Sequence, residues 1–207
     1  VDARFVYNEN GLRVQKIVNG VVTDYVLQGK NVVHMTKGSD ELHFFYDAQN
    51  RPAVVVYNNV PYAYVKNLQG DVIAILDAAG NVVVSYAYDA WGAPIGKSGA
   101  LAETLGTVQP FRYRGYVYDE ETGMYYLQIR FYSPVVSRFL TNDGEQTLCV
   151  DYECIKDRNL KNYCGNNPVN RKDEGGDFWA LIGAAVGAII SAGFKLADQL
   201  ISGTKIE

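Results

Sequence analysis

The sequence predicts a mainly β protein built as an antiparallel meander, and three observations predict it. Turn-forming residues recur every 8 to 12 positions through the first hundred residues. The runs between them are rich in β-branched and aromatic side chains, which fit the pleated surface of a sheet. The 207 residues include 16 tyrosines and only six prolines, and 48% of the side chains are hydrophobic, so the chain can bury a core.

Residues 1–98 are expected to form short strands joined by tight turns. The strands that the pattern predicts span 13–18, 21–27, 42–46, 54–57, 72–76 and 82–88. The turn signals between them are Asn10-Gly11, Asn19-Gly20, Gly29, Gly38-Ser39, Asn50, Asn58-Asn59, Gly70, Gly80 and Trp91-Gly92. An Asn-Gly pair accommodates positive φ at both central positions of a hairpin, which agrees with this arrangement.

A finer signature recurs at several of these turns: Asp or Asn, usually after Tyr, with Gly three positions later. The Asp or Asn side chain can accept a hydrogen bond from the backbone two residues on, and Gly tolerates the left-handed conformation. One copy would fit a generic hairpin turn, whereas four imperfect copies favour a repeat. The residues assigned to repeat turns are Asn8, Gly11, Asp47, Asp77, Gly80, Asp89, Gly92, Asp119 and Gly123.

Residues 111–140 alternate aromatic, apolar and charged side chains and contain one turn signal, at 120–123. This alternation predicts the two strands of a β-hairpin.

The repeat turns, the run 112–140 and the segment 159–170 together resemble the YD-repeat (Rhs) family over about residues 1–177. This family is related to the Tc toxin C-component and to teneurin shells. The resemblance implies an antiparallel YD-repeat β-strip at 1–98 that forms part of a hollow β-cocoon shell. It implies a repeat-associated core at 99–177, and it implies that the shell encloses a C-terminal payload.

The resemblance also implies an aspartyl-type self-cleavage site. By position, the two catalytic acids would be Asp143 and Asp173, with Arg138 orienting one of them, and the cut would lie between Gly176 and Asp177. Peptide hydrolysis of this kind needs two carboxylates that share a proton, one to activate water and one to protonate the leaving group.

An alternative interpretation of the same acids is that Asp143 and Asp173 only form turns. Where the family has Asp-Pro pairs, Gly144 and Glu174 follow these residues here, and Asp177 replaces a frequent Leu. Because the chain has only two histidines, both in the meander, no other catalytic activity is expected.

Residues 178–207 begin with 17 residues without a charge and are expected to form a short α-helical C-terminal segment. Three interpretations are open: a helix packed inside the shell as the start of the payload, a membrane-inserting segment over 178–201, or a helix docked on the surface.

Charge and cysteine content limit the partners. The net charge is −4 and no run of like charges exceeds three, so no nucleic-acid footprint is predicted. Cys149, Cys154 and Cys164 allow one disulfide and a free thiol, or three thiols, and a zinc site would need a fourth ligand. No metal and no cofactor are expected.

The function that this resemblance implies is that of the C-terminal core of a secreted or surface-located bacterial toxin of the Rhs type. Its expected partners are its own C-terminal payload, the rest of the shell upstream, and an immunity or secretion-apparatus protein. Since the chain begins at Val1 without a signal-type segment, we expect a piece of a longer protein. The alternative is a non-cleaving cell-surface module for adhesion or carbohydrate binding, with tyrosine-rich outer faces.

Overall fold

The computed structural model describes residues 2–141, 161–173 and 179–181. Of the residues that the sequence singles out, Asp143, Gly176 and Asp177 lie outside these ranges, as do Cys149 and Cys154. Residues 182–207, most of the predicted C-terminal helix, also lie outside them.

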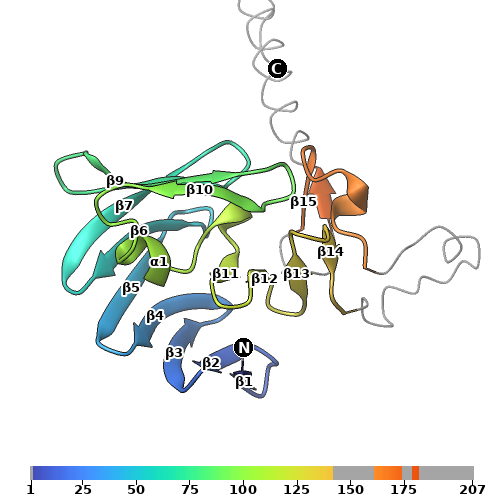
Figure 1. Ribbon diagram of the computed structural model, residues 1–207, viewed down its shortest axis with the longest axis horizontal. Coiled ribbons are helices and arrows are strands. Elements are labelled where there is room, and N and C mark those ends of the chain that lie inside the picture. Colours follow the sequence, from blue (N-terminus) through green and yellow to red (C-terminus); the bar gives the residue numbers. More distant parts are fainter. Residues whose placement is uncertain (1, 142–160, 174–178, 182–207) are drawn as a thin grey trace, which may run out of the picture.

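Ten strands form one antiparallel sheet in which every strand pairs with its neighbour in sequence. Figure 1 shows the course of this sheet from the N-terminus onward. The predicted meander is therefore confirmed. Its strands are β1 (Ala3–Tyr7), β2 (Arg13–Val18), β3 (Val21–Gln28), β4 (Asn31–Lys37), β5 (Asp40–Tyr46), β6 (Pro52–Tyr57), β7 (Val60–Lys66), β8 (Val72–Leu76), β9 (Val82–Tyr88) and β10 (Pro94–Ser98). The strand order leaves β1 and β10 at the two edges of the sheet.

Alternating burial separates the two faces of this sheet. In β5, Leu42 and Phe44 are buried, whereas Glu41, His43 and Phe45 are exposed. Because successive side chains of a strand point to opposite faces, the buried set lies on one face of the sheet. The sheet is curved, with the short helix α1 (Leu105–Val108) on its concave side (Figure 1). Leu105 of α1 belongs to the buried cluster, so the buried face is the inner one. Its buried cluster contains Tyr25, Met35, Leu42, Phe44, Val55, Tyr64, Val72, Ile75, Val84 and Tyr86.

The segment after β10 lies against the inner face of the sheet. It begins with α1 and a 3₁₀ turn, η1 (Tyr113–Gly115). Four short strands follow, paired in sequence order: β11 (Val117–Asp119), β12 (Met124–Tyr126), β13 (Phe131–Ser133) and β14 (Arg138–Phe139). Residues 105–140 are called the plug below.

The plug corrects one detail of the sequence interpretation. The turn at 120–123 does join β11 to β12, but residues 111–140 contain four strands and a 3₁₀ turn where two longer strands were predicted. Positive φ at Arg114, Gln128 and Ser137 interrupts the run, because an extended strand cannot continue through that conformation.

Beyond the plug, the described chain contains η3 (Cys164–Asn166) and a two-stranded sheet of β15 (Arg171–Asp173) and β16 (Trp179–Leu181). The helix that the sequence predicts from residue 178 is wrong for Trp179–Leu181, which form a strand. These three residues pair with β15, and the backbone hydrogen bonds of that pairing replace those of a helix. Among the described residues, no helix is long and apolar enough to span a bilayer.

Candidate functional site: a plug that joins the two ends of the sheet

Arg112 fixes the start of the plug. Its guanidinium donates hydrogen bonds to the carbonyl oxygens of Gly106 (2.5 Å), Phe111 (3.2 Å) and Gln109. The carbonyls of Gly106 and Gln109 belong to the end of α1, where backbone acceptors lack partners within the helix. The guanidinium also lies 4.3 Å from the ring centre of Tyr86, so it links α1 to strand β9.

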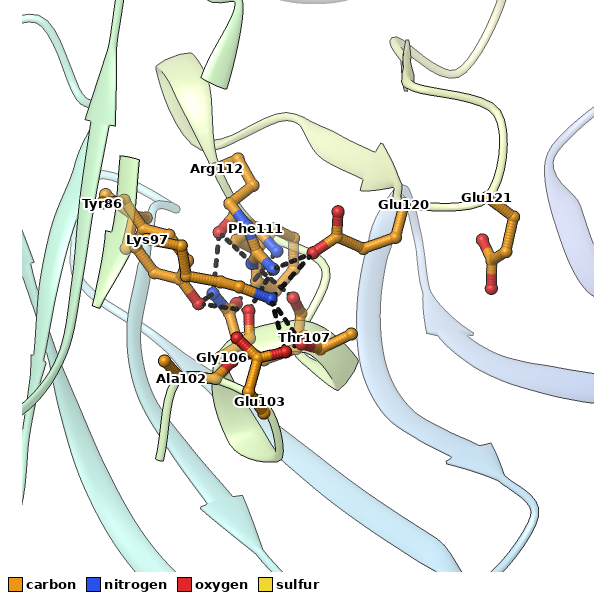
Figure 2. Close-up of polar contacts among 12 residues, drawn as sticks. Tyr86, Lys97, Ala102, Glu103, Gly106, Thr107, Phe111, Arg112, Glu120 and Glu121 are labelled. Carbon is orange, nitrogen blue, oxygen red and sulfur yellow. Dashed lines mark hydrogen bonds and ion pairs between the residues drawn. The ribbon is translucent and has the colours of Figure 1, made fainter. Parts of the chain in front are cut away.

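Figure 2 shows that Lys97 and Glu120 continue this polar cluster. Lys97 Nζ donates to Thr107 Oγ1 at 2.6 Å and lies 3.5 Å from Glu120 Oε1. Glu120 Oε1 is 3.8 Å from Arg112 Nη2, so one carboxylate faces both cations. Glu121, the next residue, points away from this cluster. The last strand of the sheet is thus tied to α1 and to the β11–β12 turn.

Gln109 is fully buried and satisfies its side-chain amide within the plug and the sheet. Its Oε1 accepts from the Tyr64 hydroxyl and from the Phe111 backbone N–H, both at 3.0 Å. Its Nε2 donates to the Tyr86 hydroxyl at 2.8 Å and to the Phe111 carbonyl at 3.0 Å. A buried polar group with all its partners specifies one position for the segment.

Tyrosines of the plug hold the turn between β9 and β10. Three hydroxyls donate to three consecutive carbonyls of that turn: Tyr113 to Ala90 at 2.9 Å, Tyr132 to Trp91 at 2.7 Å, and Tyr125 to Gly92 at 2.7 Å. The contact is close, since a Cβ placed on Gly92 would lie 2.5 Å from the ring of Tyr113. The last hairpin of the sheet is therefore docked into the aromatic core of the plug.

Buried charges attach the plug to the other end of the sheet. Arg13 Nη1 is 2.6 Å from Asp119 Oδ2, and Lys16 Nζ is 3.0 Å from Asp119 Oδ1. Glu121 accepts from Lys16 at 2.8 Å and from Lys37 at 2.7 Å. Burial alone would raise the pKa of Glu121, but the two lysines outweigh it and lower that pKa to about 2. The β11–β12 hairpin is thereby bound to β2 and β4.

Aromatic contacts reinforce the same attachment. The Arg13 backbone N–H donates to the Tyr126 hydroxyl at 3.0 Å, and the Arg13 guanidinium lies 4.4 Å from the Tyr126 ring centre. Phe5 of β1 packs on Phe131 of β13 with 5.3 Å between ring centres. The plug consequently contacts both the first and the last hairpin of the ten-stranded sheet.

The plug does not fill the inner side completely. A cavity of about 290 Å³ remains between the sheet and the plug, and its walls include Tyr25, Tyr46, Phe111 and Tyr116. This pocket is open to solvent, since its lining also includes the exposed side chains of Lys30, Gln49 and Asn50.

Asp173, one of the two predicted catalytic acids, is the last residue of β15 and contacts the plug through Arg130 and Tyr116. It is 3% exposed, and its Oδ2 is 3.4 Å from Nη2 of buried Arg130. Its carbonyl accepts a hydrogen bond from the Tyr116 hydroxyl, which is 3.2 Å from the Tyr163 hydroxyl. The register places Asp173 opposite Trp179. The predicted scissile bond therefore falls in the sequence between β15 and β16.

Of the other predicted members of this site, Arg138 alone lies among the described residues. Arg138 is exposed in β14, where it pairs with Ser133 and forms an isolated bridge with Asn162. Asp143 lies outside the described residues, as do Gly176 and Asp177. Sequence reasoning missed Arg130, whose signal was a lone cation in an otherwise apolar, aromatic stretch.

Cys164, the one cysteine in the part of the chain that the structure describes, is a free thiol buried beside Tyr163. Burial raises the pKa of its thiol to about 12. The thiol is therefore protonated at neutral pH and is a poor nucleophile and metal ligand.

The repeat turns share one hydrogen-bond pattern. In the turn that starts at Asp89, Oδ1 accepts from the backbone N–H of Trp91 and of Ala93, both at 2.8 Å. The Oδ1 atoms of Asn8, Asp47 and Asp77 likewise accept from the backbone N–H groups two and four residues later. Asn67, which the sequence interpretation did not single out, makes the same two hydrogen bonds. The residue three positions after each of them has positive φ: Gly11, Asn50, Gly70, Gly80 and Gly92. Asp119 differs, since only its main-chain carbonyl closes the turn at Gly123.

Residues 32–169 match the teneurin YD-shell family. The chain is 38% identical over 200 residues to a tRNA3(Ser)-specific nuclease WapA of Bacillus spizizenii, covering 95% of this chain and 8% of that protein. It is 32% identical over 140 residues to Salivary gland surface protein 1 of Aedes aegypti, covering 65% of this chain and 4% of that protein. The chain thus spans less than a tenth of the length of these curated relatives.

Solved structures agree on the fold. The chain aligns with a TcdB2-TccC3-Cdc42 crystal structure at a TM-score of 0.65 and 22% identity, over 84% of this chain and 9% of that one. It aligns with a Tc holotoxin pore of Photorhabdus luminescens at a TM-score of 0.64 and 21% identity, with the same coverage. The resemblance stated from the sequence is confirmed, and the chain belongs to the teneurin YD-shell family.

Proposed function

We propose that this chain closes one end of a hollow β-shell in a secreted or surface-located bacterial toxin of the Rhs type. The observation that carries the proposal is that the plug lies on the inner face of the sheet and bonds to both its first and its last hairpin. A curved sheet whose inner face is covered and whose ends are joined through a plug forms a cap rather than an open ribbon.

The free edge of β1 is the place where the upstream part of the shell would attach. An edge strand presents unpaired backbone N–H and C=O groups, and closed β architectures satisfy them by adding the next strand. Strand β1 is paired only with β2 among the described strands. The preceding repeats of the same protein are therefore the partner that fits this edge.

A C-terminal payload is the second proposed partner. The relatives named tRNA nuclease WapA and double-stranded DNA deaminase toxin A carry enzymatic names, and this chain spans only 8% and 5% of them. We infer that the shell is a common container and that the enzymatic part lies elsewhere in such proteins. An immunity or secretion-apparatus protein would belong to the same system.

Self-cleavage between Gly176 and Asp177 is the finer part of the proposal. One of Asp143 and Asp173 would activate a water molecule, and the other would protonate the departing amine of Asp177, which leaves Gly176 with a new carboxylate. Burial of Asp173 next to Arg130 supports a role for this acid, since it orients the carboxylate in a site from which water is largely excluded. Arg130 is the better candidate for the orienting cation than Arg138, which is exposed.

Intact-mass analysis of the purified chain tests the cleavage. The expected result is a fragment that ends at Gly176, lost in Asp143→Asn and Asp173→Asn. Asp77→Asn is the matched control, because asparagine forms the same turn at Asn8 and Asn67 and should leave cleavage unchanged. Persistent cleavage in both acid variants would exclude the two-carboxylate mechanism.

Arg130→Gln and Arg138→Gln separate the two candidate cations. We expect slower cleavage in the first and an unchanged rate in the second, with thermal unfolding of both variants showing that the fold is retained. The opposite order would assign the orienting role to Arg138.

The alternative function, a non-cleaving module for adhesion or carbohydrate binding, has support from the similarity to an insect surface protein. It requires tyrosines on the outer faces. Among the described residues, Tyr7 is the only tyrosine that is exposed, because the others face the inner side or the plug. The tyrosines therefore favour a role in holding the shell together.

A further inference from the structure

Two histidines and a glutamate meet on the outer face of the sheet, away from the plug. His34 of β4 lies directly opposite His43 of β5 in the antiparallel register. Glu41 lies two residues before His43 and so shares its face, since side chains on a strand alternate. Burial agrees, because Glu41 and His43 are exposed and the intervening Leu42 is buried.

The three side chains are within the reach of one ion. Glu41 Oε1 is 3.3 Å from His43 Nε2 and 3.9 Å from His34 Nε2. One ligand atom of each residue lies within 4.8 Å of the other two. The imidazole rings are 4.4 Å apart between centres, with 37° between their planes.

These separations fit tetrahedral coordination. Zinc binds imidazole nitrogen and carboxylate oxygen at about 2.1 Å, so neighbouring ligand atoms of a tetrahedral site lie about 3.4 Å apart. The observed 3.3 and 3.9 Å require only small side-chain rotations to reach that value. Two opposite residues of adjacent strands are held at a fixed spacing by the backbone, so the sheet itself presets the site.

The surroundings favour a cation at this place. On the flanking strands β3 and β6, Val26 lies opposite His34 and Val56 lies opposite His43. Neither valine has a polar atom that could compete with the ion for the imidazoles. Thr36 follows His34 by two residues and lies on the same face of β4. Asp24 of β3 lies opposite Thr36, so it adds a negative charge diagonally across from His34. The two imidazoles are 3.1 Å apart between their Nδ1 atoms, so at most one of them can donate to the other.

We propose that His34, His43 and Glu41 bind one Zn²⁺ ion on the outer face of the shell, with a fourth position open to water. The ligand set selects the metal, because imidazole with a carboxylate suits zinc and related transition metals. Magnesium and calcium need six or more oxygen ligands and are not served by two imidazoles. The ion would cross-link β4 and β5, two strands whose pairing leaves the histidines side by side.

Titration calorimetry with ZnCl₂ on the full chain, with its cysteines reduced, tests the site. We expect that His34→Gln and His43→Gln each weaken zinc binding at least tenfold and that Glu41→Gln weakens it less. Thr36→Ala is the matched control, since Thr36 lies opposite Glu41 on the same face without being a ligand. It should bind zinc like the unmodified chain.

Two further measurements keep the test specific. Zinc should raise the thermal midpoint of the unmodified chain and of Thr36→Ala but not that of His43→Gln, while MgCl₂ should raise none of them. Cobalt substituted at the site should show no thiolate charge-transfer band, which separates it from binding by the three cysteines. Unchanged zinc affinity in both histidine variants, equal loss in Thr36→Ala, or a thiolate band at the first equivalent would each overturn the proposal.

Discussion

Single residues decide how the sheet and the plug meet. Gly80 and Gly92 occupy the same place in two repeat turns and have nearly the same φ, 85° and 86°. Their surroundings differ. A Cβ on Gly80 would have no neighbour within 4 Å, whereas a Cβ on Gly92 would overlap the ring of Tyr113. One turn position is therefore free and the other is part of an interface.

The pair Gly80→Ala and Gly92→Ala measures that interface. Both variants have the backbone strain of alanine at positive φ, about 1 kcal/mol. Gly92→Ala must also displace Tyr113, so we expect it to lose about 3 kcal/mol in total. Urea denaturation gives both values. Equal losses in the two variants would show that the turn is not packed against Tyr113.

Local patterns at the residue scale predict turns but not long-range partners. Four turn residues could be assigned from the sequence because the backbone partners of their side chains lie only two and four residues away. They are Asn8, Asp47, Asp77 and Asp89. Asp119 also opens a turn, with Gly123 four positions later instead of three, yet its carboxylate binds Arg13, 106 residues earlier. Nothing in the neighbourhood of either residue in the sequence indicates that pairing.

At the scale of elements, charged groups connect hairpins that are distant in sequence. The β11–β12 turn carries Glu121, which bridges Lys16 of β2 and Lys37 of β4. Because both cations favour its ionised form, its pKa in the folded state is about 2, below the ordinary value of 4.5. Such a lowered pKa stabilises the fold at every pH above the value of the unfolded chain.

Acid should therefore weaken this connection within a defined window. The contribution of Glu121 is complete above about pH 4.5 and is lost as the pH falls toward 2. We expect Glu121→Gln to reduce stability at pH 7 by about 2 kcal/mol, since solvent screens part of the interaction, and to lose less stability than the unmodified chain between pH 4.5 and 2. Urea denaturation at several pH values checks this.

The matched control for that measurement is Glu9→Gln, because Glu9 is exposed and lies away from the lysine pair in the first repeat turn. It should leave the acid dependence unchanged. Parallel pH curves for the unmodified chain and Glu121→Gln would contradict the assignment.

Elements were predictable from the sequence where burial alternates strongly. Strand β5 alternates clearly and was expected, whereas β4 has one buried residue, Met35, and gave no comparable signal. Strand β7 contains Pro61, which weakens a strand pattern. Pro61 has no backbone N–H to donate to a neighbouring strand. It is tolerated here because β7 pairs with β8 only from Ala63 onward, so no hydrogen bond to β8 is lost at Pro61.

The candidate site was less predictable than the fold. Asp173 could be proposed from the family pattern, but Arg130 is 43 residues away in the sequence, and only the folded chain brings the two side chains together. The His34–His43 pair depends in the same way on register, which the exact length of the β4–β5 turn determines.

At the scale of the whole molecule, the sheet and the plug form one packing unit. The buried cluster of the sheet includes Leu105 and Phe111 of the plug. The ring of Phe111 packs edge-on against Phe44, Tyr46 and Tyr64, with centres 5.0 to 6.2 Å apart. A sheet with one apolar face needs such a cover, because an exposed apolar face promotes aggregation.

Removing the plug should therefore unfold the sheet. A chain of residues 1–104 would expose Met35, Leu42, Val55 and Ile75, each 2% exposed or less in the closed structure. We expect this fragment to bind a hydrophobic dye, to self-associate and to lack a cooperative transition in urea. A chain of residues 1–181, which retains every described contact, is the control and should unfold cooperatively like the full chain. A cooperative transition in the 1–104 fragment at the same urea concentration would show that the strip is stable alone, and the plug would then be an accessory to the shell instead of its closure.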